Sequence, residues 1–191
     1  MALTLDNRTP DLLSNPTATC PQTPEELETI TVSTLRFGTV EVETDLVITF
    51  PEGMIGFEKN TRYTIIAQEG TGTLRWLQSL DTPALAFPIT EPWQFRPDYV
   101  ATLSDSDTQQ LKLSDEIPTL VFVIVTVPPK NPQEMTANLL APLIVNVATR
   151  NAKQVIVQET EYTTRHRIVD EMARAKSVRM EAVSVSRAKA A

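Results

Sequence analysis

The stretch "TLVFVIVTV" at residues 119–127 is almost entirely apolar and rich in β-branched side chains. A short run of this kind, bounded by turn signals, is typical of a strand that is covered on both faces of a sheet. "PLIVNVA" at 142–148 has the same character, and "KQVIV" at 153–157 predicts one more strand after it. We therefore expect the first two runs to be the central strands of the fold.

Upstream of these strands the apolar residues alternate with polar ones. Alternation with period two predicts strands that turn one face to a core and the other to water. Turn signals at Gly38, "PEG" (51–53) and Gly70 to Gly72 separate the runs, and such short connections cannot hold the crossover helix that parallel strands need. The sequence thus predicts a mainly β, antiparallel fold from the runs "ITVSTLRF", "TVEVE", "LVITF", "RYTIIA", "LRWLQSL" and "ALAFPI".

A few short helical turns are expected between the strands. "TPEE" (23–26) has the form of a capping box, Ser106 to Gln109 offers a second, and Asn131 can cap a single turn that Pro132 starts. The organisation that follows is a flexible N-terminal extension over 1–29, a β domain over 30–168, and a flexible or weakly helical tail over 169–191.

Charge and composition narrow the classes of function. The 191 residues carry a net charge of −7, and residues 31–170 alone hold eleven bases against seventeen acids. Because an acidic body repels phosphates, we expect no direct binding to nucleic acid. No leader-like start and no run of eighteen apolar residues occurs, so we expect no membrane association. The single cysteine, Cys20, fits a reducing cytoplasm.

The usual traces of catalysis are missing from the sequence. Five glycines form no phosphate-binding loop, and no cluster of Cys and His could ligate zinc. We therefore expect no cofactor, no metal and no enzymatic activity. The single histidine, His166, is interpreted as a surface residue, although a hydrolase that uses His166 with neighbouring acids is an open alternative.

Three stretches place large apolar or aromatic side chains in turns, which favours binding over catalysis. They are "FPEGMIGFE" (50–58), "WQFRPDY" (93–99) and "MTANLLAP" (135–142). The alternative is that Trp93, Phe95 and Tyr99 plug the ends of a barrel. Asn138 is expected to be structural, with its amide bonded to the preceding helical turn, whereas Met135 and Thr136 are freer to face a partner.

Several blocks stand in order along the chain, including "FGTVEV" (37–42), "ITFPEGMIGFE" (48–58), "WLQSLDTPALAFPIT" (76–90), "FRPDY" (95–99) and "MTANLLAPLIVN" (135–146). Together they resemble one family, the flagellar assembly factor FliW. The resemblance covers roughly residues 36–166 and runs through many blocks in order, which makes it specific.

The resemblance implies a single small antiparallel β-barrel-like domain without catalysis. Proteins of this family bind flagellin in the cytoplasm and, when free of it, bind and antagonise the translational repressor CsrA. We expect the same partner switch here, performed by a monomer. A chaperone that only shields flagellin, without effect on the repressor, is the alternative. The candidate partner-binding residues are Phe95, Arg96, Pro97, Asp98, Tyr99, Met135, Thr136 and Asn138.

Overall fold

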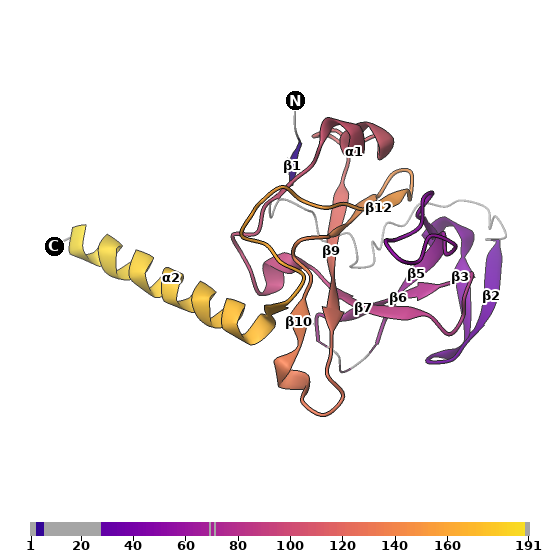
Figure 1. Ribbon diagram of the computed structural model, residues 1–191, viewed down its shortest axis with the longest axis horizontal. Coiled ribbons are helices and arrows are strands. Elements are labelled where there is room, and N and C mark those ends of the chain that lie inside the picture. The colour runs from indigo at the N-terminus through magenta and orange to yellow at the C-terminus, as the bar shows by residue number, and fades with distance from the viewer. Residues whose placement is uncertain (1–2, 6–27, 69, 71, 190–191) are drawn as a thin grey trace, which may run out of the picture.

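The structure is a computed structural model that describes residues 3–5, 28–68, 70 and 72–189. Short strands make up the body of the molecule, which we define as residues 28–168, and one long helix projects from it (Figure 1). The chain is thus mainly β with few helices, as expected. The expected turn at "TPEE" lies outside the described residues.

One antiparallel sheet forms the centre of the body. Its strand order is β12-β11-β9-β7-β6-β5-β4, and Leu143 lies opposite Phe122 where the two expected central strands pair. These strands are β4 (Ile48–Thr49), β5 (Arg62–Ala67), β6 (Arg75–Ser79), β7 (Ala86–Thr90), β9 (Thr119–Thr126), β11 (Leu143–Asn146) and β12 (Ala152–Gln154). The prediction of two central strands is therefore confirmed for β9 and β11.

The remaining strands flank this sheet. β10 (Thr136–Ala137) pairs with both β9 and β13 (His166–Arg167), and β1 (Thr4–Leu5) pairs with β8 (Ala101–Thr102). β2 (Thr29–Thr34) and β3 (Gly38–Glu43) form a separate hairpin. The hairpin packs Val32 and Val42 against Leu80, which attaches it to the body.

The barrel-like part of the fold prediction is not confirmed. In the described part of the chain no sheet closes on itself. A single bridge between Thr49 and Asn151 joins the two edges, with the Thr49 amide donating to the Arg150 carbonyl at 2.9 Å. Closure needs a ladder of such bonds, and β4 and β12 are too short to form one.

Short helices begin where local hydrogen bonds favour them. In α1 (Asp105–Gln110) the N-cap is Ser104, whose hydroxyl accepts from the Asp107 amide at 3.1 Å, so the predicted cap at Ser106 is wrong. The expected turn after Asn131 is present as η3 (Pro132–Glu134), but the Asn131 side chain makes no capping bond. Two other turns are η1 (Thr44–Leu46) and η2 (Pro92–Gln94).

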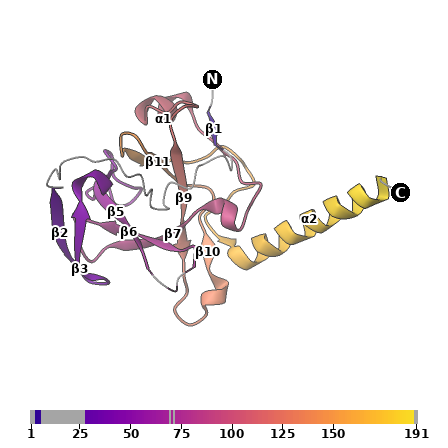
Figure 2. The same ribbon diagram turned by 180° about the vertical axis from the view of Figure 1, so that it is seen from behind.

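The chain continues into α2 (Ile168–Lys189), a helix of 22 residues. Figures 1 and 2 show α2 leaving the body on the side away from the β2–β3 hairpin. Ile168 packs on the core, whereas Val169 and Met172 are exposed. None of the helices in the described residues is long and apolar enough to span a membrane.

Candidate functional site

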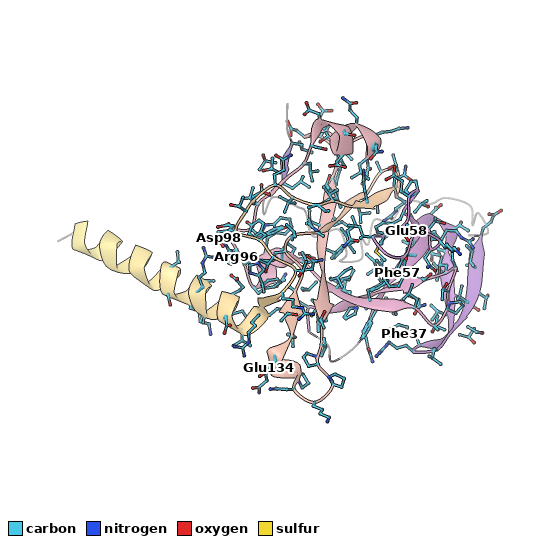
Figure 3. The ribbon with its side chains drawn as sticks, in the orientation of Figure 1. Phe37, Phe57, Glu58, Arg96, Asp98 and Glu134 are labelled. Atoms are coloured by element: carbon cyan, nitrogen blue, oxygen red, sulfur yellow. The ribbon has the colours of Figure 1, made fainter. Side chains whose placement is uncertain are left out.

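The two blocks predicted to bind partners converge at the start of α2. The Tyr99 hydroxyl donates to the Leu139 carbonyl at 2.9 Å, and the Ile168 amide donates to the Met135 carbonyl at 3.1 Å. Arg96 and Asp98 lie beside the first turns of α2, and Glu134 lies below the point where the helix begins (Figure 3). We call this region, formed by residues 95–99, 134–139 and 161–174, the α2 root.

The aromatic residues of the first block are not available to a partner as they stand. Phe95 is 3% and Tyr99 is 1% exposed, and both belong to the hydrophobic core together with Trp93. The Trp93 indole donates to the Tyr99 carbonyl at 3.0 Å. The three residues are therefore core residues, as the alternative expected, although in the described residues no barrel closes around them. Burial raises the pKa of the Tyr99 hydroxyl.

The other candidates keep some accessible surface. Pro97 and Asp98 are exposed, and Met135, Thr136 and Asn138 are half-buried. Thr136 lies in β10, between β9 and β13, so its backbone is paired on both sides. A partner could reach the exposed pair directly and the half-buried residues only in part.

Arg96 is the buried cation of the α2 root, with only 5% of its surface exposed. Its guanidinium contacts three carboxylates: Glu171 at 2.8 Å, Asp98 at 2.9 Å and Glu161 at 3.2 Å. It also lies over the ring of Tyr162. A buried guanidinium needs such compensation, because its desolvation alone costs several kcal/mol.

Glu171 joins this cluster to His166. His166 Nδ1 lies 2.8 Å from Glu171 Oε1, and His166 Nε2 accepts from the Thr163 amide at 2.9 Å. This pattern assigns the ring proton to Nδ1, which donates to Glu171. Burial raises the pKa of the Glu171 carboxyl, but hydrogen bonds from His166 and Arg96 outweigh it and hold the pKa below its ordinary value.

His166 is therefore not the surface residue that the sequence suggested. Its side chain is 13% exposed, and both ring nitrogens are engaged within the chain. Asp98 is tied to α2 in a similar way by Arg174, at 2.9 Å. The hydrogen bond from Arg174 lowers the pKa of Asp98, burial works against it, and the charge of Arg96 lowers it further.

Asn138 uses its amide differently from what we expected. Its Oδ1 accepts from the Ala141 amide at 3.0 Å, and its backbone amide donates to the Ile124 carbonyl at 2.9 Å. The side chain thus bonds forward, to the turn that leads into β11, and not back to the turn at η3. The geometry gives Asn138 a local role in shaping the chain.

A second candidate surface lies at the other end of the body, in the loop 50–58 (Figure 3). Ile55 is 58% and Phe57 is 37% exposed, and the ring of Phe57 packs edge-on against Phe87 at 4.9 Å between centroids. The Gly56 amide donates to the carboxylate of Glu58 at 2.9 Å. We call Ile55, Phe57, Glu58 and Phe87 the Phe57 surface.

Gly53 fixes the shape of this loop. Its φ is +70°, and a Cβ added there would lie 2.4 Å from the Glu58 Cα atom. Only glycine fits such a close approach of two backbone segments. The exposed side chains of the Phe57 surface therefore sit on a closed and well-defined loop.

Another aromatic pair was not singled out from the sequence. Phe37 packs against Trp76 at 5.9 Å, and the guanidinium of Arg36 covers the Trp76 ring at 3.9 Å. Leu35 beside them is 83% exposed. Phe57 packs on Phe87, which lies opposite Leu77 in the sheet and not opposite Trp76. Side chains of neighbouring residues in a strand point to opposite faces, so the Phe37–Trp76 pair lies on the other face of the sheet from Phe57. The break of alternation just before Gly38 is the signal that could have marked it.

The remaining features offer little for small-molecule chemistry. Within the described ranges no group of three or more His, Cys, Asp and Glu side chains could hold a metal ion. A small pocket of about 120 Å³ lies between the loop at Gly53, Leu111 and Ala152. Lys153 at its rim is already paired with Asp107 at 2.9 Å. The two surfaces described above are the stronger candidates.

Comparison with known proteins places the chain among its relatives. The sequence model of the family described as "FliW protein" matches residues 31–168. A flagellar assembly factor FliW from Bdellovibrio bacteriovorus is 41% identical over 137 residues, covering 72% of this chain and 78% of the relative. The FliW of Thermotoga neapolitana is 35% identical over 147 residues, covering 77% of this chain and 99% of its own.

A solved structure agrees with these relatives. The crystal structure of a flagellar assembly factor FliW superposes with a TM-score of 0.67 at 34% identity, covering 72% of this chain and 96% of that chain. The family match includes the whole central sheet and ends at residue 168, where α2 begins. The chain therefore belongs to the FliW family of flagellar assembly factors.

Proposed function

We propose that this protein is a cytoplasmic, non-catalytic regulator of flagellar assembly that works by partner switching. It binds flagellin, and when free of flagellin it binds and antagonises a CsrA-like translational repressor. The observation that carries the proposal is the family match over residues 31–168, which covers nearly the whole body. While flagellin accumulates, the repressor stays free and blocks flagellin synthesis.

The Phe57 surface supports a role in flagellin binding. Exposed apolar side chains on a well-defined loop supply binding energy at low entropic cost, because the loop is already shaped. Ile55 and Phe57 fit an apolar stripe of a partner, and Glu58 gives the surface a polar rim. The accessible residues of the α2 root, Pro97, Asp98, Met135 and Thr136, are proposed as secondary contacts.

The acidity of the body supports antagonism of an RNA-binding protein. Residues 31–170 carry six more acids than bases, and they would stand close to RNA in a complex with the repressor. Like charges at that distance repel, and the repulsion is screened over about 10 Å at 0.1 M salt. Antagonism by charge should therefore weaken as the salt concentration rises.

A titration tests the whole cycle. Labelled RNA is bound to the CsrA-like repressor, this protein is added, and then flagellin is added, with RNA binding followed by fluorescence anisotropy. We expect RNA to be released at the second step and rebound at the third. If the protein binds flagellin but leaves the RNA affinity of the repressor unchanged, it is a shielding chaperone and the partner switch is wrong.

A further inference from the structure

The sign of the charge reverses where α2 leaves the body. Residues 1–170 hold twelve bases and twenty-two acids, whereas residues 171–191 hold five bases and two acids. The family match ends at residue 168, so the basic segment lies outside the matched residues. The helix projects into solvent (Figures 1 and 2), so most of its length lies apart from the body.

One side of α2 is used to attach it to the body. Glu171 contacts Arg96 at 2.8 Å, and Arg174 contacts Asp98 at 2.9 Å. The other side begins with three exposed residues, Val169, Met172 and Lys176. At 3.6 residues per turn, positions 179, 180, 183 and 187 follow on that same side.

In the sequence, this side combines bases with apolar residues. The sequence places Lys176, Arg179 and Arg187 there among Val169, Met172, Met180 and Val183, and no acid. A helix that lies in an apolar groove uses anchors at this spacing, and the bases indicate an acidic groove. Two such helices would not pair with each other, because their like charges repel.

A groove with both apolar and charged lining lies at the opposite end of the body. It has a volume of about 600 Å³ and lies between the β2–β3 hairpin and the turn at 147–150. Ile30, Val47 and Val147 are among its lining residues, and one acid, Asp45, and one base, Arg150, line it as well. Glu28 and Glu43, both exposed, lie next to Thr44 of the lining, whose amide donates to the Glu28 carbonyl. Together with Asp45 these acids outnumber Arg150 around the groove.

We propose that α2 of one copy docks into this groove of a second copy. Within one chain the contact cannot form, because α2 and the β2–β3 hairpin lie at opposite ends of the body (Figures 1 and 2). The contact is therefore head-to-tail, and it joins copies into a ring or an open chain. This departs from the monomer expected from the sequence.

The first experiment is sedimentation velocity of the full chain over a range of concentrations. At about 0.1 M salt, where screening extends over about 10 Å, we expect the mean mass to rise with concentration. At about 1 M salt, where screening shortens to about 3 Å, the rise should be much smaller. A wild-type protein that stays monomeric at every concentration in low salt overturns the proposal, including the case in which α2 serves another acidic partner.

Two variants test the two halves of the contact. The helix variant carries Lys176→Glu, Arg179→Glu and Arg187→Glu, and the groove variant carries Glu43→Lys and Asp45→Lys. Each alone should associate at least about tenfold more weakly than the wild type, a loss of about 1.4 kcal/mol. Lys59→Glu, Lys112→Glu and Lys130→Glu together make the matched control, since these exposed bases lie outside both halves.

Mixing the variants gives the decisive result. The groove variant keeps an intact helix and the helix variant keeps an intact groove, so one contact between them should survive. We expect a complex of one copy of each that stops at two chains, and melting curves and circular dichroism verify that both variants are folded. If the wild type associates while the mixture stays monomeric, or if the control loses as much association as the helix variant, the head-to-tail contact is wrong.

Discussion

The α2 root and the Phe57 surface differ in how far their side chains are already paired or buried within the chain. At the α2 root, buried Arg96 contacts three carboxylates of the same chain, and the aromatic residues beside it are in the core. At the Phe57 surface, Ile55 and Phe57 are exposed on a loop whose shape Gly53 fixes. The first region is closed upon itself, whereas the second presents apolar surface that the fold leaves uncovered.

The difference separates two roles that the sequence had merged. A charge that is already compensated within the chain gains little from a partner, since binding would only exchange one ion pair for another. When a partner covers exposed apolar surface and removes it from water, the free energy of the complex is lowered. We therefore assign stability mainly to the α2 root and binding mainly to the Phe57 surface.

The largest effect on stability is expected from Arg96→Met. The substitution leaves the buried carboxylate of Glu171 without its cation, and breaking a buried pair in this way costs about 3 kcal/mol. Urea denaturation measures the free energy of unfolding. Arg167→Met is the control, because its ion pair with Asp170 is solvent-exposed and should cost less than about 0.5 kcal/mol. Equal losses in the two variants would mean that the α2 root is not a structural cluster.

Gly53→Ala should follow, with a loss of about 2 kcal/mol from the unfavourable positive φ and the clash with Glu58. Flagellin binding should fall with it, because the loop can no longer hold its shape. Gly56→Ala in the same loop is the control: its φ is also positive, +83°, but an added Cβ would meet nothing within 4 Å. Thermal melts and flagellin titrations of both variants separate the effect of the clash with Glu58 from the effect of the positive φ alone.

Phe57→Ala should weaken flagellin binding about tenfold, or by about 1.4 kcal/mol, because Phe57 is the aromatic anchor of its surface. Met135→Ala at the α2 root is predicted to weaken it less, since Met135 is half-buried and only a secondary contact. Isothermal titration with flagellin measures both. The reverse order of effects would move the binding role to the α2 root.

Asn138→Ala is expected to cost about 1 kcal/mol, at the lower end of what a buried amide would cost, because the side chain is only half-buried. The lost contact is the bond from the Ala141 amide. Urea denaturation should show this loss with flagellin affinity unchanged. An unchanged stability with weakened binding would make Asn138 a contact residue.

The smallest expected effect is a pH dependence of the free energy of unfolding, which arises from Glu171 at the α2 root. Because the pKa of Glu171 in the folded protein is held below its ordinary value of 4.5, its carboxylate stabilises the fold above that pH. The contribution is lost as pH falls through the lowered pKa. The difference in unfolding free energy between wild type and Glu171→Gln should therefore stay constant above pH 4.5 and narrow as the pH falls below that value. If the difference in unfolding free energy between the two proteins is the same at every pH, the Glu171 carboxylate does not cause the pH dependence.

The sequence identified the central strands because their signal is local. The runs at β9 and β11 are apolar almost throughout, and such runs are buried wherever they fall in the sheet. The helix α1 shows the limit of a local signal. Ser104 and Ser106 both stand near its start, and only the hydrogen bond to the Asp107 amide decides in favour of Ser104.

Long-range features could not be read in the same way. Arg96 meets Glu161 and Glu171 across 65 and 75 residues, and no period in the sequence joins them. The expected barrel depended on closure, which here rests on one bridge between Thr49 and Asn151. The family blocks located both candidate regions, but burial alone separates Phe95 and Tyr99 from Phe57.

Hydrogen–deuterium exchange with and without flagellin tests most directly the claim that the Phe57 surface is the main binding region. We predict that flagellin protects backbone amides in residues 50–58, and that Phe57→Ala removes this protection. Residues 95–99 and 135–139 should change little, since the core already covers much of them. Protection of those two segments with none in 50–58 would contradict the account.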